Sequence, residues 1–331
     1  MRKVLIIGTG GTIVSKETHE GLVPTIKIDE LVNSFPEVKE ICEPSYIQIC
    51  NLDSTNITPN HWLDMAKVIQ ENYDNYDGFL IIHGTDTMAY TAAGLNYLIQ
   101  NSTKPIVLTG AQKPIFNEGS DGKRNLLDAL IYASDEDSFG VSIVFYGKVI
   151  LGTRARKNYT KDYMAFGTVN FPYIAEISNG IIRRIELIKN VEKTKFYDKL
   201  NTNVGLIKLF PGLKDDVLEY AINKYDALVI ESFGTGGLPE YSNFAHIISA
   251  GIEKGKLFLM TTQVPNEGSD FRAYNVGFRI INTLNVLEAH DMTSESAIAK
   301  LMWILAYEHD FEKQKEMFYK EIGFDITWKE K

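Results

Sequence analysis

The sequence predicts two α/β domains: a larger N-terminal domain with a doubly wound, mainly parallel sheet, and a smaller C-terminal α/β domain. Short apolar runs alternate with longer helical patterns along the chain, which is typical of this class. The runs are apolar on both faces, like strands of a parallel sheet that helices cover on each side. The length of 331 residues fits two domains, at roughly 100–200 residues per domain.

The N-terminal domain is predicted to begin with a strand and to continue as a strand–helix repeat. Thr58-Pro59 marks the start of the first helix, in which Trp62, Ala66 and Ile69 recur at helical spacing. The expected strands are Lys3–Gly8, Gly78–His83, Pro105–Thr109 and Val141–Tyr146, and the expected helices are Thr58–Tyr73, Thr85–Gln100 and Ser120–Ala133.

The alternation weakens between Arg184 and Thr202, where charged and polar residues dominate. We therefore expect a linker at residues 191–203, between an N-terminal domain at 1–190 and a C-terminal domain at 204–331. The second domain repeats the alternation on a smaller scale. Its expected strands are Val204–Leu209, Ala227–Glu231 and Lys256–Thr261, and its expected helices are Asp215–Asn223, Asn243–Glu253 and Ser294–Tyr307.

Composition and charge exclude several classes of protein. Lys and Arg number 34 against 43 Asp and Glu, a net charge of −9, so nucleic-acid binding through bulk charge is not expected. No apolar run approaches the ~18 residues of a membrane helix, and the run after Arg2-Lys3 is too short for a signal peptide. The two cysteines lack CxxC spacing and the histidines lack metal-ligand spacing. We expect a reduced, cytoplasmic protein without a metal site.

Small and hydroxyl-bearing residues follow three of the predicted strands. Gly8–Thr12 ends the first strand, His83–Thr87 follows the second, and Gly110-Ala111-Gln112 follows the third. Ligands of open α/β sheets bind outside the carboxyl ends of the strands, and glycines there allow close approach to the backbone. These segments are therefore the predicted binding site, and Asp86 is their one carboxylate.

The segment Gly8–Thr12 has three interpretations. A dinucleotide-binding GxGxxG motif needs a third glycine at position 13, which is Ile13, and a helix directly after it. A tight turn after a strand is the structural interpretation. The third is an exposed hydroxyl nucleophile, Thr12, under a lid, because Val14–Pro24 reads as a polar, mobile loop without an apolar face.

Each of the other motifs also has a structural interpretation. Thr85 or Asp86 could cap the following helix, and His83, beside a buried strand, is more typical of a structural histidine than of a catalytic base. Asp53-Ser54-Thr55 could be an ordinary polar loop. The basic run Arg154–Lys161 could be a solvated surface, or it could contain a lysine that takes part in proton transfer.

Together the motifs resemble those of the bacterial-type L-asparaginases, the asparaginase–glutaminase family, and are most similar to its cytoplasmic type I group. The two long signatures are Thr9–Ile13 and His83–Tyr90. The similarity covers nearly the whole chain. It continues through Asp53–Thr55, Thr109–Gln112, Arg156-Lys157, Asn170–Tyr173, Glu231–Gly237 and Thr261–Gln263.

The resemblance implies hydrolysis of asparagine to aspartate and ammonia without cofactor or metal. It implies that Thr12 is the nucleophile of an acyl-enzyme and that Thr85, Asp86 and Lys157 form a second constellation for proton transfer. The implied substrate contacts are made by Asp86, by backbone N–H groups near Gly11 and Thr85, and by Asp53, Ser54, Thr55 and Ala111. The site of this family lies at a dimer interface, so a homodimer or a dimer of dimers is expected.

Two positions differ from many members of the family: Leu22 replaces a tyrosine of the flap, and Gly237 replaces an asparagine that a partner subunit contributes. Three rival functions remain open. The first is a glutaminase or the amidase subunit of a tRNA-dependent amidotransferase, although that subunit normally has an additional N-terminal region. The second is a non-catalytic amino-acid sensor, and the third is a nicotinamide-dependent oxidoreductase.

Overall fold

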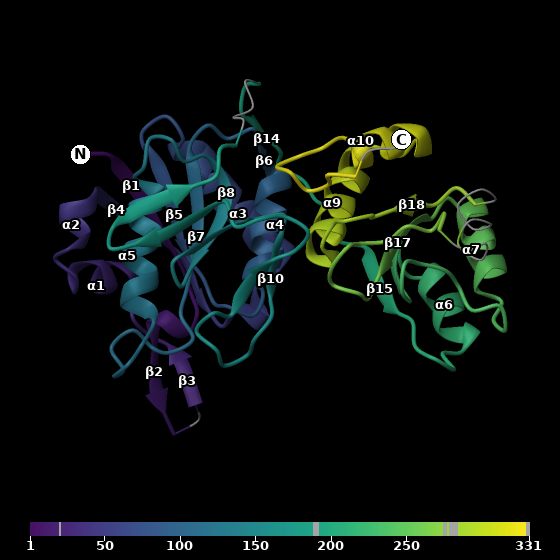
Figure 1. The fold of residues 1–331 in the computed structure, drawn as a ribbon, viewed down its shortest axis with the longest axis horizontal. Helices are drawn as coiled ribbons and strands as arrows, with labels where there is room; N and C mark the ends of the chain where they lie inside the picture. The colour runs from purple at the N-terminus through teal and green to yellow at the C-terminus, as the bar shows by residue number, and fades with distance from the viewer. Residues whose placement is uncertain (20, 188–191, 274–276, 278–283, 329–331) are drawn as a thin grey trace. The chain divides into compact units, whose positions relative to one another are not determined.

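The computed structural model describes residues 1–19, 21–187, 192–273, 277 and 284–328. The chain divides into two compact units, Met1–Asp198 and Lys199–Lys331, and both are α/β (Figure 1). The predicted boundary at residues 190–191 lies outside the described residues.

The N-terminal unit is built on an eight-stranded sheet with the order β13-β12-β9-β8-β7-β5-β1-β4. Five neighbouring strands are parallel, and β9, β12 and β13 extend the sheet in antiparallel fashion. The parallel strands are β1 (Lys3–Gly10), β4 (Glu43–Leu52), β5 (Gly78–Ile82), β7 (Pro105–Thr109) and β8 (Gly140–Phe145); the others are β9 (Lys148–Leu151), β12 (Ala175–Ser178) and β13 (Ile181–Arg184).

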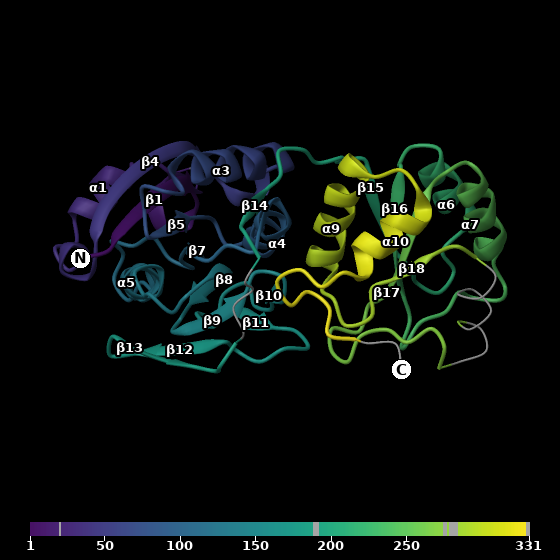
Figure 2. The same cartoon turned by 90° about the horizontal axis from the view of Figure 1, so that it is seen from above.

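Helices cover both faces of this sheet (Figure 2). On one face α3 (Pro59–Asn72) packs against α4 (Met88–Leu98), and on the other α2 (Val38–Ile41) packs against α5 (Gly122–Ala133), with α1 (Ile28–Asn33) beside β1 and β4. The steps β5–α4–β7 and β7–α5–β8 run in the same direction across the sheet but use opposite faces. The two crossovers therefore have opposite hands, and one departs from the usual right-handed rule.

The predicted strands are confirmed where the sequence is uniformly apolar. Every residue of β5 and β7 is buried. Helix α3 begins at the predicted Thr58-Pro59, where Thr58 and His61 form a reciprocal capping box. Helix α4 begins only at Met88, because Thr85–Thr87 form bends at the end of β5. The sequence reasoning missed β4, a partly exposed outer strand in which polar residues interrupt the apolar ones.

The expectation of an irregular polar loop at Val14–Pro24 is wrong. A short 3-10 helix, η1 (Thr12–Val14), leads into an antiparallel hairpin of β2 (Ser15–Thr18) and β3 (Gly21–Pro24). The hairpin projects beyond the rest of the unit (Figure 1). The residue Glu20, which the prediction included, lies outside the described residues. Hydrogen bonds between the two strands satisfy their backbone N–H and C=O groups. The hairpin therefore forms without a buried apolar face.

Two small antiparallel pairs complete the N-terminal unit. They are β10 (Ala155–Lys157) with β11 (Phe166–Thr168), and β6 (Ile99–Gln100) with β14 (Lys195–Phe196).

The C-terminal unit has a four-stranded parallel sheet in the order β15-β16-β17-β18. Its strands are β15 (Val204–Lys208), β16 (Ala227–Ser232), β17 (Leu257–Thr262) and β18 (Leu287–Glu288), and its helices include α6 (Asp215–Ile222), α7 (Phe244–Glu253), α9 (Ser294–Tyr307) and α10 (Phe311–Tyr319). Lys300 of α9 forms a fully buried ion pair with Asp325, with 2.6 Å between Nζ and Oδ2. Among the described residues of the chain, no helix has the length and apolar character needed to span a membrane.

Candidate active site

The predicted site residues other than Lys157 come from the carboxyl ends of four parallel strands. Gly11 and Thr12 follow β1, Asp53–Thr55 follow β4, His83–Thr87 follow β5, and Gly110–Gln112 follow β7. The strand order places β4 on one side of β1 and β5 on the other. The chain therefore reverses direction across the sheet at β1 and β5, which is where open α/β sheets bind their ligands.

Three of these loops are in direct backbone contact. Gly11 has a φ of 87°, and a Cβ on it would lie 2.4 Å from the Cα of Gly84. A Cβ on Gly84 would lie 2.7 Å from the Cβ of Ser54. Only glycine fits at both positions, because real Cβ atoms do not approach other atoms so closely. The loops after β1, β4 and β5 are thereby fixed against one another.

Thr12 is partly exposed at the start of η1. The N–H of Gly11 donates to the carbonyl of Leu52 at 2.9 Å, so it is not available to a ligand. Within the described residues, the N–H groups of Thr12 and Thr85 have no hydrogen-bond acceptor. These two N–H groups are free donors on the loops after β1 and β5.

Lys157, Thr85 and Asp86 form one hydrogen-bonded group. The ammonium of Lys157 donates to Thr85 Oγ1 at 2.8 Å and to Asp86 Oδ1 at 2.6 Å. The side chain of Lys157 is 16% exposed and that of Asp86 is 53% exposed. Thr85 is buried, so its hydroxyl is held between groups that can exchange a proton with it.

The interpretation of Arg154–Lys161 as a solvated surface is wrong for its first half. Lys157 lies on β10 and faces the site, and Arg154 is fully buried, with its guanidinium 5.7 Å from the ring centroid of Phe171. Lys161 is exposed, as a surface interpretation requires.

Ser54 is buried and connects the second loop to the third. Its Oγ accepts the N–H of Asp86 at 3.1 Å, and its carbonyl accepts Thr87 Oγ1 at 2.7 Å. Because Ser54 Oγ is the acceptor in its bond with Asp86, its own O–H is available to donate to a substrate carboxylate.

Asp53 and Thr55 flank Ser54 and are exposed. They bond to each other: Asp53 Oδ1 accepts the N–H of Thr55 at 2.8 Å and its hydroxyl at 2.7 Å. The structure places them on the same loop as Ser54 but in no bond with the Lys157–Asp86 group.

The loop after β7 contributes backbone groups. Ala111 is buried, and within the described residues neither its N–H nor its C=O has a hydrogen-bond partner. Buried backbone groups without a partner are rare in native proteins. The adjacent Gln112 bonds from its side chain to Thr85 Oγ1 at 3.4 Å and to the carbonyl of Asp162 at 3.0 Å.

His83 is a structural residue, as the sequence indicates. It is fully buried, with Nδ1 2.7 Å from the carbonyl of Gly84 and Nε2 3.0 Å from Thr91 Oγ1. Burial lowers the pKa of His83 to about 4. The imidazole is therefore neutral at physiological pH, and both nitrogens are occupied, which leaves it unable to act as a base toward a ligand.

The sequence reasoning missed Asp121 and Asn125, which hold the loop after β7 from the N-terminus of α5. An Asp and an Asn four residues apart at a predicted helix start was the available signal. Among the described residues there is no group of three or more His, Cys, Asp or Glu side chains arranged to hold a metal ion.

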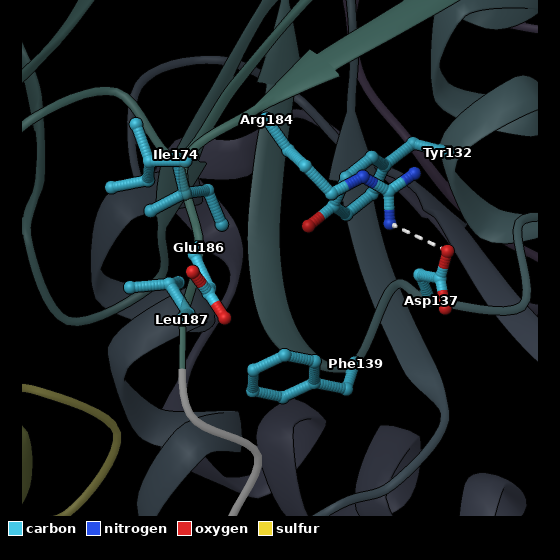
Figure 3. A pocket seen from close by; sticks show the side chains of 8 residues that line it. Tyr132, Asp137, Phe139, Ile174, Arg184, Glu186 and Leu187 are labelled. Atoms are coloured by element: carbon cyan, nitrogen blue, oxygen red, sulfur yellow. Dashed lines mark ion pairs between the residues drawn. The ribbon is translucent and has the colours of Figure 1, made fainter.

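A cavity of about 240 Å³ lies elsewhere in the N-terminal unit (Figure 3). It is lined by Tyr132, Phe139 and Leu187 among others, and by Arg184, whose guanidinium reaches Asp135 at 2.9 Å and Asp137 at 3.8 Å. None of the predicted site residues lines it.

Comparisons with known proteins agree with the motif analysis. Residues 3–190 match the family Asparaginase, N-terminal, and residues 203–318 match the Glutaminase/Asparaginase C-terminal domain. The chain is 36% identical to an L-asparaginase of Thermococcus kodakarensis, over 98% of this chain and 99% of that protein. It is 31% identical to one of the subunits of the glutamyl-tRNA(Gln) amidotransferase of Pyrococcus abyssi, over 98% of this chain and 77% of that protein.

Solved structures give the same result for the fold. The thermostable L-asparaginase from Thermococcus kodakarensis superimposes with a TM-score of 0.91 at 34% identity, over 99% of this chain and all of that one. L-asparaginase I from Vibrio cholerae superimposes with a TM-score of 0.89 at 29% identity, over 99% of each chain.

The low pKa of His83 makes stability depend on pH. The unfolded chain binds a proton below about 6.5, whereas the folded state does so only below about 4. The stabilisation from neutral His83 is therefore complete above pH 6.5 and is lost as pH falls toward 4, by up to about 3 kcal/mol. We expect urea unfolding between pH 4 and 7.5 to show this slope in the wild type and a shallower one in His83→Gln.

His290→Gln is the parallel variant in the other unit, because burial also lowers the pKa of His290 to about 4. It should lose a slope of similar size and retain the one contributed by His83. A His83→Gln protein with the full wild-type slope would contradict this account.

Proposed function

The chain belongs to the asparaginase family and hydrolyses L-asparagine to L-aspartate and ammonia, and we propose that Thr12 carries this reaction through an acyl-enzyme. One observation supports the proposal most: Thr12 follows Gly11, and Gly11 packs against Gly84, next to the Thr85 and Asp86 that Lys157 contacts. A weak hydroxyl nucleophile needs such a neighbouring group to take its proton.

The two ends of the substrate meet groups of matching charge. Asp86 Oδ1 accepts from Lys157, while Oδ2 has no partner within the described residues and can accept the substrate ammonium. Ser54 donates its O–H to the substrate carboxylate, and Asp53 holds the same loop by accepting the N–H and the hydroxyl of Thr55. The amide carbonyl and nitrogen meet the backbone of Ala111.

Acylation proceeds by attack of Thr12 Oγ1 on the side-chain carbonyl carbon. The hydroxyl proton of Thr12 enters the Thr85–Lys157 pair, which returns one proton to the amide nitrogen, and the C–N bond breaks as that nitrogen leaves as ammonia. Water then cleaves the ester, and aspartate leaves with Thr12 restored. The N–H groups of Thr12 and Thr85 stabilise the oxyanion in both halves.

The relationship to L-asparaginase I of Vibrio cholerae supports placing the chain in the type I group. We further propose that it acts in the cytoplasm, where Cys42 and Cys50 remain free thiols, and as a homodimer or a dimer of dimers. The second candidate function is glutamine hydrolysis, alone or within an amidotransferase. Its support is the 31% identity to the Pyrococcus abyssi amidotransferase protein.

The test is ammonia release from a panel of L-asparagine, L-glutamine and other amino-acid amides, with Thr12→Val beside the wild type. We expect L-asparagine to be the preferred substrate and Thr12→Val to lose at least 10³-fold in kcat with its fold intact, since the valine keeps the shape and removes only the hydroxyl. Preferential turnover of L-glutamine would favour the second candidate. A Thr12→Val protein with near wild-type kcat would exclude Thr12 as the nucleophile.

Lys157 and Lys161 provide a matched comparison within one basic run. We expect Lys157→Met to reduce kcat by 10²–10⁴-fold, the usual effect of losing a well-placed proton-transfer group. Lys161→Met should stay within about twofold of wild type, because an exposed lysine away from the site contributes little. Equal losses in the two variants, measured by steady-state kinetics, would show that Lys157 has no special role.

We propose that the β2–β3 hairpin closes over the site. It starts three residues after Thr12, is anchored at its base by Asn51 Nδ2 donating to the carbonyl of Pro24 at 2.8 Å, and exposes Leu22 and Val23. Closure would bury Leu22 and exclude water from the oxyanion. Amide hydrogen exchange in residues 15–24 should slow when L-aspartate is bound. Leu22→Asp should raise KM, whereas Leu22→Tyr should be tolerated; unchanged exchange at saturating ligand would mean that the hairpin is not a lid.

A further inference from the structure

Asp121 is a buried carboxylate surrounded by N–H donors. It is 3% exposed and accepts the N–H of Gln112 at 3.0 Å on each oxygen, the N–H of Lys113 at 3.1 Å, and Asn125 Nδ2 at 3.0 Å. Within the described residues no ion pair involves Asp121. Its charge is therefore stabilised by backbone and amide dipoles, which is a strong and directional arrangement.

The position of Asp121 on its helix suggests a second role. It is the N-cap residue of α5, but its side chain makes no capping bond to that helix. Ser120 Oγ instead accepts the N–H of Gly122 at 3.0 Å. An N-cap carboxylate ordinarily accepts the N–H of the second or third helical residue. The carboxylate of Asp121 instead accepts N–H groups of the loop after β7.

The bonds from α5 hold the loop on both sides of Ala111. Before it, Asn125 Nδ2 donates to the carbonyl of Gly110 at 2.9 Å. After it, Asp121 accepts from Gln112 and Lys113, and Ser120 Oγ donates to the carbonyl of Lys113 at 3.0 Å. Within the described residues, the N–H and C=O of Ala111 are among the backbone groups of this segment that have no hydrogen-bond partner.

We propose that Asp121 is a positioning residue for amide hydrolysis. It fixes residues 110–113 so that the free backbone groups of Ala111 face the reacting amide and Gln112 reaches the Thr85 hydroxyl. Asp121 itself touches neither substrate nor reacting atoms. The inference rests on the proposed function, because it assigns a role to Ala111 in that reaction. A reacting amide displaced by about 1 Å can lose on the order of 10²-fold in rate.

Asp121→Asn is the sharpest test, because the groups that face the carboxylate are all donors. Gln112 N–H contacts both oxygens, so either orientation of the asparagine amide sets an NH₂ against a donor. We expect kcat for L-asparagine to fall about 10–100-fold, with KM changed less than about threefold, because the ammonium and carboxylate contacts lie on other loops. Amide exchange at Gln112 and Lys113 should rise while exchange in the remaining strands stays unchanged.

Asp128→Asn is the matched control. Asp128 lies on the same helix and pairs with Arg124 at 3.4 Å, away from the loop. It should keep wild-type kcat. Should Asp121→Asn fail to fold, Asp121→Ser is the second variant, since serine keeps an N-cap hydroxyl but cannot accept all three donors. All variants are assayed well below their own Tm.

The outcomes separate the positioning role from the proposed function. A wild type that releases no ammonia from L-asparagine would contradict the proposed function itself. An active wild type with equally active, folded Asp121→Asn and Asp121→Ser proteins would overturn only the role of Asp121. So would a loss of kcat shared by Asp128→Asn, or one accompanied by faster exchange throughout the N-terminal unit, since either would indicate general destabilisation.

Discussion

The candidate site depends on one constraint, the close contact of three loops at two glycines. Gly11 presses against Gly84, and Gly84 presses against Ser54, at distances that leave no room for a Cβ on either glycine. This contact joins the ends of strands that leave the sheet's switch point in opposite directions. Thr12 lies on one side of it and Thr85 on the other. A methyl group at either glycine would separate the nucleophile from its proton-transfer partners.

The carboxylates of Asp86 and Asp121 have different surroundings, and the surroundings of each suit its role. Asp86 is half exposed and holds an ammonium through one oxygen, so its partners can change when a charged ligand arrives. Asp121 is buried and bonded to fixed N–H donors, so its partners cannot change without moving the backbone. A buried charge without donors would be strongly unfavourable, and the loop after β7 is thus held wherever Asp121 remains ionised. The carboxylate of Asp86, whose partner can change, is suited to binding a ligand. The carboxylate of Asp121, whose partners are fixed, is suited to positioning the loop after β7.

The unusual crossover of α5 has a consequence for the site. The crossover β7–α5–β8 uses the face of the sheet opposite to that of α4. The start of α5 lies next to the loop that leaves β7, where Asn125 bonds to Gly110. Asp121 and Asn125, one turn apart, then reach the same loop from one side of the helix. On the other face, α3 and α4 approach closely because Gly94 faces the indole of Trp62. The sheet is therefore covered by one tightly packed helix pair and by one helix whose first turn serves the site.

The sequence by itself determined the α/β class and the positions of the buried strands along the chain, because apolar segments such as β5 and β7 are typical of internal strands. It also predicted the loops of the candidate site. It could not identify β4 or the β2–β3 hairpin, since partly exposed strands are stabilised by pairing and not by burial. Lys157 and Lys161 belong to one basic run, but the fold places Lys157 at the site and leaves Lys161 exposed. The fold also assigned Asp121, because two backbone N–H groups and the side chain of Asn125 converge on its carboxylate only after the chain has folded.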